Sequence, residues 1–427
     1  MRTKVIIWGK TVGYAEWLTE ENRAAFQYDP GFLSSGLQLA PITMPLSSAV
    51  YDFPQLSKDT YKGLPAMLAD SLPDSFARKV MDAYYQATGK EASRVTPLEY
   101  LCYLGKRGMG ALEYEPAIPE KKFANSVLIN LEELTSLASA VLSRRQNITA
   151  KGHDALIDIL RVGTSAGGAR AKAVVAYNEK TRELRSGQVD APEGFEHWLL
   201  KFDGVDNDTF REPKGFGRIE YAYYLMAKAA GVEMTECRLL EENGRAHFMT
   251  RRFDRNGNKK LHMQTLCAIA QMDYRRPEGN SYELAFRALR ALNLDYSQQE
   301  ELYRRMLFNI IARNQDDHTK NISFLMNTSG EWSLSPAYDI AYAYNPEGEW
   351  TAMHQMSMLG KRKDFSRDDM LQFGKLQGVK KAPDILEKVL EAVSNWKTFA
   401  QQAGLDGVMT KQISAAHLVD QLGTEHK

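Results

Sequence analysis

The chain has 427 residues, which is long enough for two or three structural units. Hydrophobic residues make up 44% and charged residues 25%, as is typical of a globular protein with a large buried core. Lysine plus arginine number 54, as do aspartate plus glutamate, so bulk electrostatic binding to DNA or to an anionic membrane surface is not predicted, whereas a local basic patch is compatible with the balance.

The first part of the chain, residues 1–120, is predicted to be rich in strands and loops. Two short apolar runs around Gly9 predict a β-hairpin. Apolar residues at helical spacing, behind a Leu-Pro-Asp start signal, predict a helix over about 75–88. Residues 121–150 show a further helical pattern, which we interpret as a connecting segment or the edge of the next domain.

The middle of the chain, residues 151–260, alternates strand-like apolar runs with loops and one amphipathic helix. Gly231 follows that helix at the position where glycine commonly ends helices. The expected elements are strands at 156–162, 172–177 and 198–202, a helix at 219–230, and either a strand or the start of a linker at 248–253.

The last part, residues 261–427, is predicted to be mainly helical. A helix containing Leu302 and Ile310 stops before the polar run 314–321, and a hairpin over 322–335 follows. A β-rich half followed by a helical half that carries polar, catalytic-looking residues predicts an α+β fold with the two lobes of a kinase.

The sequence also predicts the compartment and the state of the thiols. Cys102, Cys237 and Cys267 form no CxxC pair, so we expect buried, inert thiols and no zinc or redox site. The apolar run Val5–Trp8 is too short for a signal peptide, and no stretch approaches the ~18 apolar residues needed to span a bilayer. A cytoplasmic location is therefore expected.

The polar run Asn314-Gln-Asp-Asp-His-Thr-Lys-Asn321 carries the strongest chemical signal. Asp316 and Asn321 have the spacing of the catalytic Asp and the metal-binding Asn in protein-kinase catalytic loops. One short loop must aim the carboxylate at the incoming hydroxyl while the amide oxygen reaches the metal. The same residue types are common in solvated loops and helix caps, and Asp317 leaves the register open by one residue.

Asp339 closes the segment Ser335-Pro-Ala-Tyr-Asp339, just after the predicted hairpin. Kinases place a hairpin between the catalytic loop and a metal-binding Asp, so Asp339 is predicted to bind magnesium. Its neighbours Tyr338 and Ile340 replace the Phe and Gly of the DFG segment, which is not the pattern of an ordinary eukaryotic-type kinase. Taken alone, an Asp after a strand also commonly occupies a turn.

The loop from Gly163 to Arg170 consists of small residues, which let backbone N–H groups approach phosphate oxygens. It matches neither a Walker A motif nor the dinucleotide-binding pattern, and a flexible turn would have the same composition.

Lys201 lies inside an apolar strand, and a buried ammonium must find an anion, such as a phosphate of ATP. Glu220 is placed to orient that ammonium from the following helix, as a helix glutamate does in kinases. An outward-facing strand lysine and a helix-terminal acid favoured by the dipole remain the alternatives. The combination is informative because its parts follow one another along the chain in the order expected of a kinase: loop, lysine, glutamate, catalytic Asp and Asn, hairpin, and Asp.

With these residues in place, the sequence resembles the HipA family of bacterial kinases over nearly the whole chain. The segments that match its motifs are Leu72-Pro-Asp-Ser75, Ser165-Ala-Gly-Gly-Ala-Arg-Ala-Lys172, Trp198–Lys201, Arg251-Arg-Phe-Asp-Arg255, Asn314–Asn321 and Pro336-Ala-Tyr-Asp339. The resemblance sets the register on Asp316, with Asn321 and Asp339 as metal ligands. It implies that Ser165 is an autophosphorylation site. Glu220 keeps the supporting role that its place in the helix predicts. The expected ATP-binding residues are Ser165, Ala166, Gly167, Gly168, Ala169, Lys172, Lys201, Arg251, Phe253, His318 and Lys320. For His318, a structural hydrogen bond within the loop is the alternative.

The resemblance further implies a protein-kinase-like fold akin to phosphoinositide 3/4-kinases. The expected parts are an N-terminal subdomain over 1–120, a kinase N-lobe over 121–255 and a helical C-lobe over 256–427. Two segments depart from the family pattern: Arg170 replaces a Gln in the loop, and 264–271 lacks an acidic Gln-Glu-Asp pattern.

The implied activity is that of a serine/threonine kinase using ATP and Mg²⁺, the toxin of a HipA–HipB-like toxin–antitoxin pair linked to persistence. The resemblance implies an aminoacyl-tRNA synthetase as substrate, such as glutamyl-tRNA synthetase. It also implies a HipB-like helix-turn-helix antitoxin, operator DNA reached through that complex, and no membrane partner. The alternatives are a weakly catalytic or non-catalytic co-repressor, and a phosphotransferase acting on a small molecule or a lipid.

Overall fold

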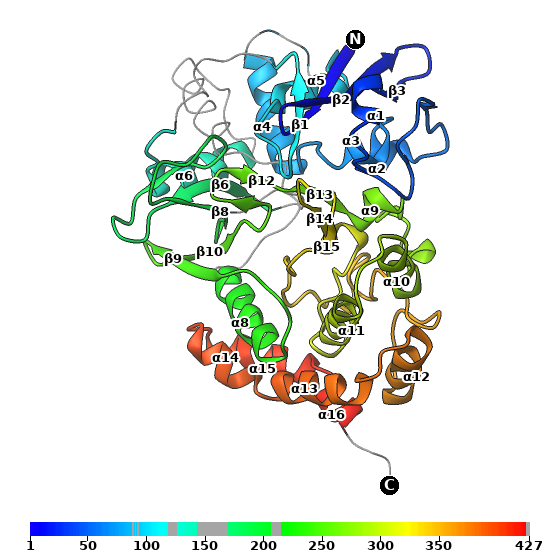
Figure 1. Ribbon diagram of the computed structural model, residues 1–427. Coiled ribbons are helices and arrows are strands. Elements are labelled where there is room, and N and C mark those ends of the chain that lie inside the picture. Colours follow the sequence, from blue (N-terminus) through cyan, green and yellow to red (C-terminus); the bar gives the residue numbers. More distant parts are fainter. Residues whose placement is uncertain are drawn as a thin grey trace.

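The computed structural model describes residues 1–87, 89, 91, 94–117, 126–142, 170–205 and 215–423. The described elements form three groups in chain order: an N-terminal sheet with short helices, a middle sheet, and a mainly helical last part (Figure 1). This is the mixed α+β arrangement that the sequence predicts. The strand expected at 156–162 lies outside the described residues, and the predicted domain boundaries stay a prediction.

The N-terminal sheet is antiparallel, in the order β4-β3-β2-β1-β5. Trp8 and Gly9 both take positive φ and make the tight turn between its first two strands, which confirms the predicted hairpin. Its elements are β1 (Arg2–Ile7), β2 (Lys10–Leu18), β3 (Arg23–Tyr28), β4 (Val50–Tyr51), β5 (Leu112–Glu115), α1 (Pro30–Leu33), α2 (Lys58–Tyr61), α3 (Ala66–Ala69) and α5 (Pro97–Leu104).

The middle sheet has the order β7-β6-β8-β10-β9 and is also antiparallel. Its strands are β6 (Lys172–Tyr177), β7 (Leu184–Ser186), β8 (Glu196–Lys201), β9 (Cys237–Glu242) and β10 (Arg245–Arg251). The strands expected at 172–177, 198–202 and 248–253 correspond to β6, β8 and β10.

Helices cover this middle sheet on two sides. Helices α4 (Ser75–Ala87) and α6 (Leu131–Leu142) share a buried cluster with Trp198 and Leu200 of β8. Helix α8 (Phe216–Ala229) packs on β9 and β10, and it begins three residues before the predicted start. A Cβ at Gly217 would lie 2.0 Å from the carbonyl oxygen of Ala246, so glycine is needed where α8 meets β10.

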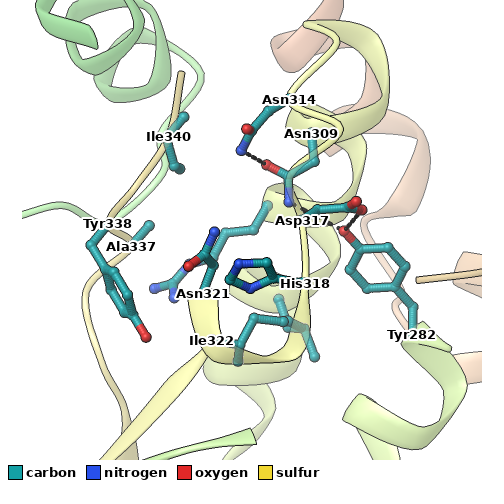
Figure 2. Close-up of a pocket in the computed structure, with 12 residues that line it drawn as sticks. Tyr282, Asn309, Asn314, Asp317, His318, Asn321, Ile322, Ala337, Tyr338 and Ile340 are labelled. Carbon is teal, nitrogen blue, oxygen red and sulfur yellow. Dashed lines mark hydrogen bonds between the residues drawn. The ribbon is translucent and has the colours of Figure 1, made fainter. Parts of the chain in front are cut away.

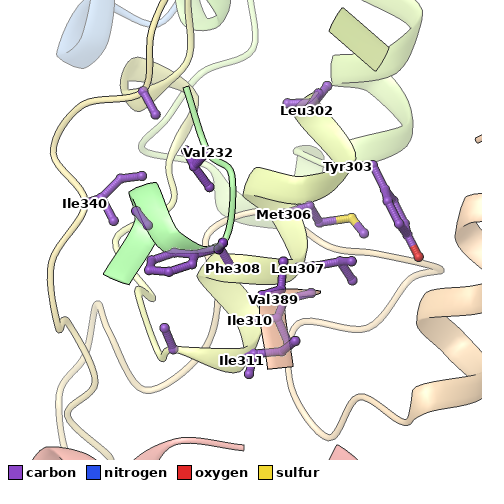
Figure 3. Packing of buried hydrophobic residues seen from close by; sticks show 14 of the residues in the cluster. Val232, Leu302, Tyr303, Met306, Leu307, Phe308, Ile310, Ile311, Ile340 and Val389 are labelled. Atoms are coloured by element: carbon purple, nitrogen blue, oxygen red, sulfur yellow. The ribbon is translucent and has the colours of Figure 1, made fainter. Parts of the chain in front are cut away.

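The last part of the chain packs around α11, whose side chains include Leu302, Met306 and Ile310 (Figure 3). Asp295 begins this helix by accepting a hydrogen bond from the backbone N–H of Gln298, and Arg313, with φ of +58°, turns the chain into the polar run. The helices here are α9 (Leu266–Ile269), α10 (Tyr282–Ala291), α11 (Tyr296–Ile311), α12 (Arg367–Gln377), α13 (Ala382–Ser394), α14 (Trp396–Gln402), α15 (Gly407–Ala416), α16 (Val419–Gly423), and the 3₁₀ turns η3 (Pro277–Gly279) and η4 (Thr319–Asn321).

The predicted hairpin after the polar run is present as β14 (Ser323–Met326) and β15 (Trp332–Leu334). A third strand, β13 (His262–Thr265), pairs with β14 and was not predicted, because its partner lies far along the chain. A separate small ribbon is formed by β11 (Arg255–Asn256) and β12 (Lys259–Lys260).

The three thiols Cys102, Cys237 and Cys267 are buried and unpaired, as predicted. Burial raises the pKa of each, so they are poor nucleophiles. No helix in the described part of the chain combines the length and apolar character that crossing a bilayer requires.

Candidate active site

Two buried lysines lie side by side on the middle sheet. Lys172 of β6 is directly opposite Lys201 of β8 in the antiparallel register, so both side chains lie on one face of the sheet. Like charges in such a pair repel, and each ammonium therefore needs its own anion. The structure provides carboxylates from three different parts of the chain.

Lys201 is the ammonium with two carboxylate partners. Its Nζ donates hydrogen bonds to Oε1 of Glu220 on α8 and to Oδ1 of Asp339. Burial alone would lower the pKa of Lys201, but Asp339 and Glu220 outweigh burial and raise that pKa above its usual value. The lysine is thus held in its charged form between two residues that the sequence assigned to the same site.

Lys172 has a partner that the sequence did not assign. Its Nζ lies 3.6 Å from Oδ2 of Asp74, and the two side chains are almost fully buried. Asp74 also accepts a hydrogen bond from the backbone N–H of Ala77 at the start of α4. Burial raises the pKa of Asp74 to about 6, although Lys172 opposes the shift. The Leu-Pro-Asp-Ser segment therefore anchors a lysine that was predicted to contact ATP.

The polar run after α11 presents one of its two aspartates to solvent. The Asp316 side chain is 43% exposed, and Oδ1 accepts a hydrogen bond from the indole Nε1 of Trp350 at 2.9 Å. The Asn321 amide donates to the backbone carbonyl of Asp316 at 2.8 Å. This hydrogen bond joins the two predicted site residues across the loop that carries both.

Asp317, the other candidate, is fully enclosed. Its carboxylate accepts hydrogen bonds from the Tyr282 hydroxyl at 2.7 Å, the Gln355 backbone N–H at 2.8 Å and His354 Nδ1 at 3.0 Å. Burial would raise the pKa of Asp317, but His354 and these donors lower it. Figure 2 shows the Asp317–Tyr282 contact behind the loop. An enclosed carboxylate cannot meet an incoming hydroxyl, which favours Asp316 as the reactive one.

Asp339 is brought to the polar run by its neighbour Tyr338. The Tyr338 hydroxyl donates to the carbonyl of Lys320 at 2.6 Å and also bonds with the hydroxyl of Ser323. Asp339 itself adopts φ of +52°, a left-handed conformation that is uncommon outside glycine, although Asp tolerates it better than most residues. Burial would raise the pKa of Asp339, but Lys201 and then Lys172 hold it below its usual value.

The oxygen atoms of Asp339 and Asn321 fit a magnesium ion. Mg²⁺ prefers oxygen ligands and is commonly held by one or two protein groups together with substrate phosphates. Within the described ranges, no group of three or more His, Cys, Asp or Glu side chains is arranged to hold a metal by itself. Carboxylate and amide oxygens suit a hard cation that arrives with a phosphate, and magnesium binding stays a prediction.

Several predicted ATP contacts lie around this centre. His318 Nε2 is 3.8 Å from Asp316 Oδ1, and Lys320 Nζ lies 5.0 Å from the centre of the Tyr274 ring. The ring of Phe253 is 5.4 Å from that of Tyr338. These three positions are close to the site, and their contact with a nucleotide stays a prediction.

Arg251 lies differently from its neighbours, because its side chain is 49% exposed and pairs with Glu196 at 2.8 Å. Ser165, Ala166, Gly167, Gly168 and Ala169 lie outside the described residues, so the phosphate loop stays a prediction. Arg170, the next residue, lies with its guanidinium 3.1 Å from the centre of the Phe216 ring and its Nη1 3.9 Å from Glu220 Oε2.

A small cavity of about 20 Å³ lies behind the polar run, with room for about one water molecule (Figure 2). Its lining includes His318, Asn321, Tyr338 and Asp317. This volume is far too small for a nucleotide.

Sequence reasoning missed Trp350, His354 and Gln355, which all contact the polar run. They lie in a stretch without regular secondary structure, and no motif marks them. A tryptophan among Gly and Glu residues at 346–350 was the available signal, since a large aromatic side chain in a polar loop needs a contact.

Comparison with known proteins shows to which family the chain belongs. The family model described as the HipA-like C-terminal domain matches residues 164–407, and that of the HipA N-terminal domain matches residues 3–115. The chain belongs to the HipA family. The HipA-family matches span both the N-terminal sheet and the two-part region that holds Lys201, Asp316 and Asp339.

Two relatives extend this finding. The HipA chain from the Shewanella oneidensis MR-1 complex of HipA, HipB and operator DNA aligns with a TM-score of 0.66 at 16% identity, covering 99% of this chain and 100% of that one. A putative kinase, Y4dM, from Sinorhizobium fredii is 25% identical over 188 residues, 40% of this chain. That alignment spans less than half, 44%, of the Y4dM protein. The first relative shows that this chain has the HipA fold.

Proposed function

We propose that this HipA-family chain is a serine/threonine protein kinase that uses ATP and Mg²⁺. The observation that carries the proposal is the ion-paired set of Lys201, Glu220 and Asp339, which spans the middle sheet and the helical part, together with the partly exposed Asp316 of the polar run. Phosphoryl transfer depends on positioning and charge stabilisation more than on covalent chemistry, and this set supplies both. The middle sheet with α8 and the helical part would act as the two lobes of a phosphoinositide 3/4-kinase-like fold.

Each residue has a defined role in this proposal. Lys201 binds ATP phosphates, and Glu220 keeps its ammonium in place. Asp339 and Asn321 supply oxygen ligands for Mg²⁺, which offsets the charge of the phosphates when it is bound. Asp316 accepts the proton of the acceptor hydroxyl as the new oxygen–phosphorus bond forms and the bond to the ADP leaving group breaks.

The first test is transfer of radiolabelled phosphate from ATP by purified protein. Asp316→Asn and Asp339→Asn should each lose ~100-fold or more in rate, as expected when a positioning carboxylate is removed. Asp384→Asn, an exposed acid at the start of α13, is the matched control and should keep full activity. Full activity in the two site variants would refute the site assignment.

We further propose that the chain is the toxin of a HipA–HipB-like pair, with a helix-turn-helix antitoxin, operator DNA bound through that complex and an aminoacyl-tRNA synthetase as substrate. The HipA fold shared with the Shewanella chain supports the partner proposal. Induced expression of wild type should arrest growth and that of Asp316→Asn should not. Equal effects of the two would instead favour a co-repressor that needs no catalysis, and phosphoproteomics after induction would identify the substrate.

A further inference from the structure

The segment 350–355 lies in the irregular stretch between Asp339 and α12 and is bonded to the polar run. The Gln355 backbone N–H donates to Asp317 at 2.8 Å, and its side-chain amide donates to the carbonyl of Gln315 at 3.4 Å. The same amide donates to the carbonyl of Trp350. The backbone that carries Trp350 is therefore fixed by the very loop that carries Asp316.

Trp350 also contacts the polar run directly, through its indole. Its Nε1–H donates to Oδ1 of Asp316 at 2.9 Å, a hydrogen bond of ordinary length that the charge of the carboxylate strengthens. His318 Nε2 lies 3.8 Å from the same oxygen, beyond hydrogen-bond distance. Among the residues that the structure describes, the second oxygen of Asp316 accepts no hydrogen bond.

The indole ring is also held from the side. Tyr274 stands edge-on to Trp350, with ring centres 6.4 Å apart, and the Tyr274 ring also contacts the His318 ring at 5.3 Å. Such aromatic contacts restrict the ring without enclosing it, and Trp350 remains 37% exposed. Both the donor and the carboxylate therefore face solvent while their geometry is fixed.

We propose that Trp350 is a positioning residue for phosphoryl transfer, which sets the plane of the Asp316 carboxylate so that its free oxygen meets the acceptor hydroxyl. The inference rests on the proposed kinase function. A carboxylate with one oxygen bonded loses its freedom to rotate, and small errors in the placement of a reacting group are costly in rate. Lys201 and its partners are untouched by this contact, so nucleotide binding should not depend on it.

Trp350→Phe keeps a ring but removes the donor, and it should lower kcat about 10-fold while KM for ATP stays unchanged. Trp350→His retains a ring N–H and should recover part of the rate. Trp8→Phe is the matched control, because it also removes an indole hydrogen bond, in this case to the carbonyl of Lys260 at 2.7 Å rather than to Asp316. An unchanged kcat in Trp350→Phe would overturn the proposal. A higher kcat would also overturn it, because the indole would then block the site.

A second readout does not depend on activity. Wild type labelled with 5-fluorotryptophan should give one ¹⁹F signal for each of its six tryptophans, and Trp350→Phe identifies the signal of interest. Asp316→Asn should shift that signal and leave the Trp8 signal in place. If wild type transfers phosphate but Asp316→Asn leaves this signal unmoved, the contact and the positioning role of Trp350 are overturned, while the kinase proposal stands. If Asp316→Asn shifts the signal but wild type transfers no phosphate, the kinase proposal and the positioning role are overturned, while the contact stands.

Discussion

Replacing Asp254 with Asn is expected to destabilise the protein strongly, although Asp254 is no part of the catalytic set. Its side chain is fully buried and accepts from Arg252 at 2.9 and 2.7 Å, from Arg255 at 2.7 Å and from the Gly110 backbone N–H at 2.8 Å. Arg255 in turn donates to the carbonyls of Gly108 and Gly110. The network therefore ties the Arg-Phe-Asp-Arg segment to the N-terminal sheet.

The size of the effect follows from burial. Asn keeps the shape but not the charge, and it leaves two buried guanidinium groups without a counter-ion. Removing one partner of a buried ion pair typically costs about 3–5 kcal/mol. Because 1 kcal/mol moves the Tm of a 150–250-residue unit by about 2–4 °C, a loss of at least ~6 °C is expected.

The matched control is Asp52→Asn, because Arg23 contacts Asp52 in the same two-bond geometry at 2.7 and 2.9 Å while both side chains are partly exposed. Solvent screens that pair, so its loss should move the Tm far less. The assay is thermal unfolding of the wild type and both variants, followed by circular dichroism. Equal Tm values for the two variants would refute the reasoning.

The stability that Asp254 contributes should depend on pH in one direction. Burial would raise the pKa of Asp254, but Arg252 and Arg255 outweigh it and hold that pKa well below the ordinary value. A depressed pKa stabilises the fold above the unfolded-state pKa of about 3.9, and this stabilisation is lost as pH falls further. The difference in stability between wild type and Asp254→Asn should therefore be constant from pH 7 to about 4 and shrink below it.

Three further outcomes are expected. Lys201→Ala should weaken ATP binding or turnover while the far-UV circular dichroism stays that of a folded chain, and unchanged nucleotide titration together with unchanged turnover would argue against its place on the phosphates. Asp317→Asn should lower the Tm, since a buried carboxylate with three donors becomes an amide that must present N–H groups to some of them, and an unchanged Tm would show that the network is dispensable. Ser165 should become phosphorylated on incubation with Mg-ATP, and the modified form should bind ATP poorly because ~1.5–2 negative charges would lie near its phosphates; mass spectrometry that finds no phosphate, or full turnover by the modified form, would exclude this switch.

Local patterns predicted many of the regular elements well. The Gly9 turn, strands β6 and β8 and the hairpin after the polar run all follow from short-range alternation and turn residues, which act over a few positions. Helix α8 begins three residues before the predicted start, because Phe216 and Gly217 carry no helix signal in the sequence. Glycine at 217 is needed for the close approach to Ala246, which is a tertiary contact. Strand β13 escaped prediction for a similar reason, since its pairing with β14 joins distant segments.

The sequence by itself determined which residue types stand at Lys201, Asp316, Asn321 and Asp339, and their spacing along the chain pointed to phosphoryl transfer. Only the tertiary structure decided which of two adjacent aspartates is enclosed, because burial of Asp317 depends on Tyr282 and on the segment 354–355, both distant in sequence. The same holds for Trp350 and Asp316, and for Lys172 and Asp74. Spacing is a property of the chain, whereas solvent access and the choice of ionic partner arise when distant segments pack together and exclude water.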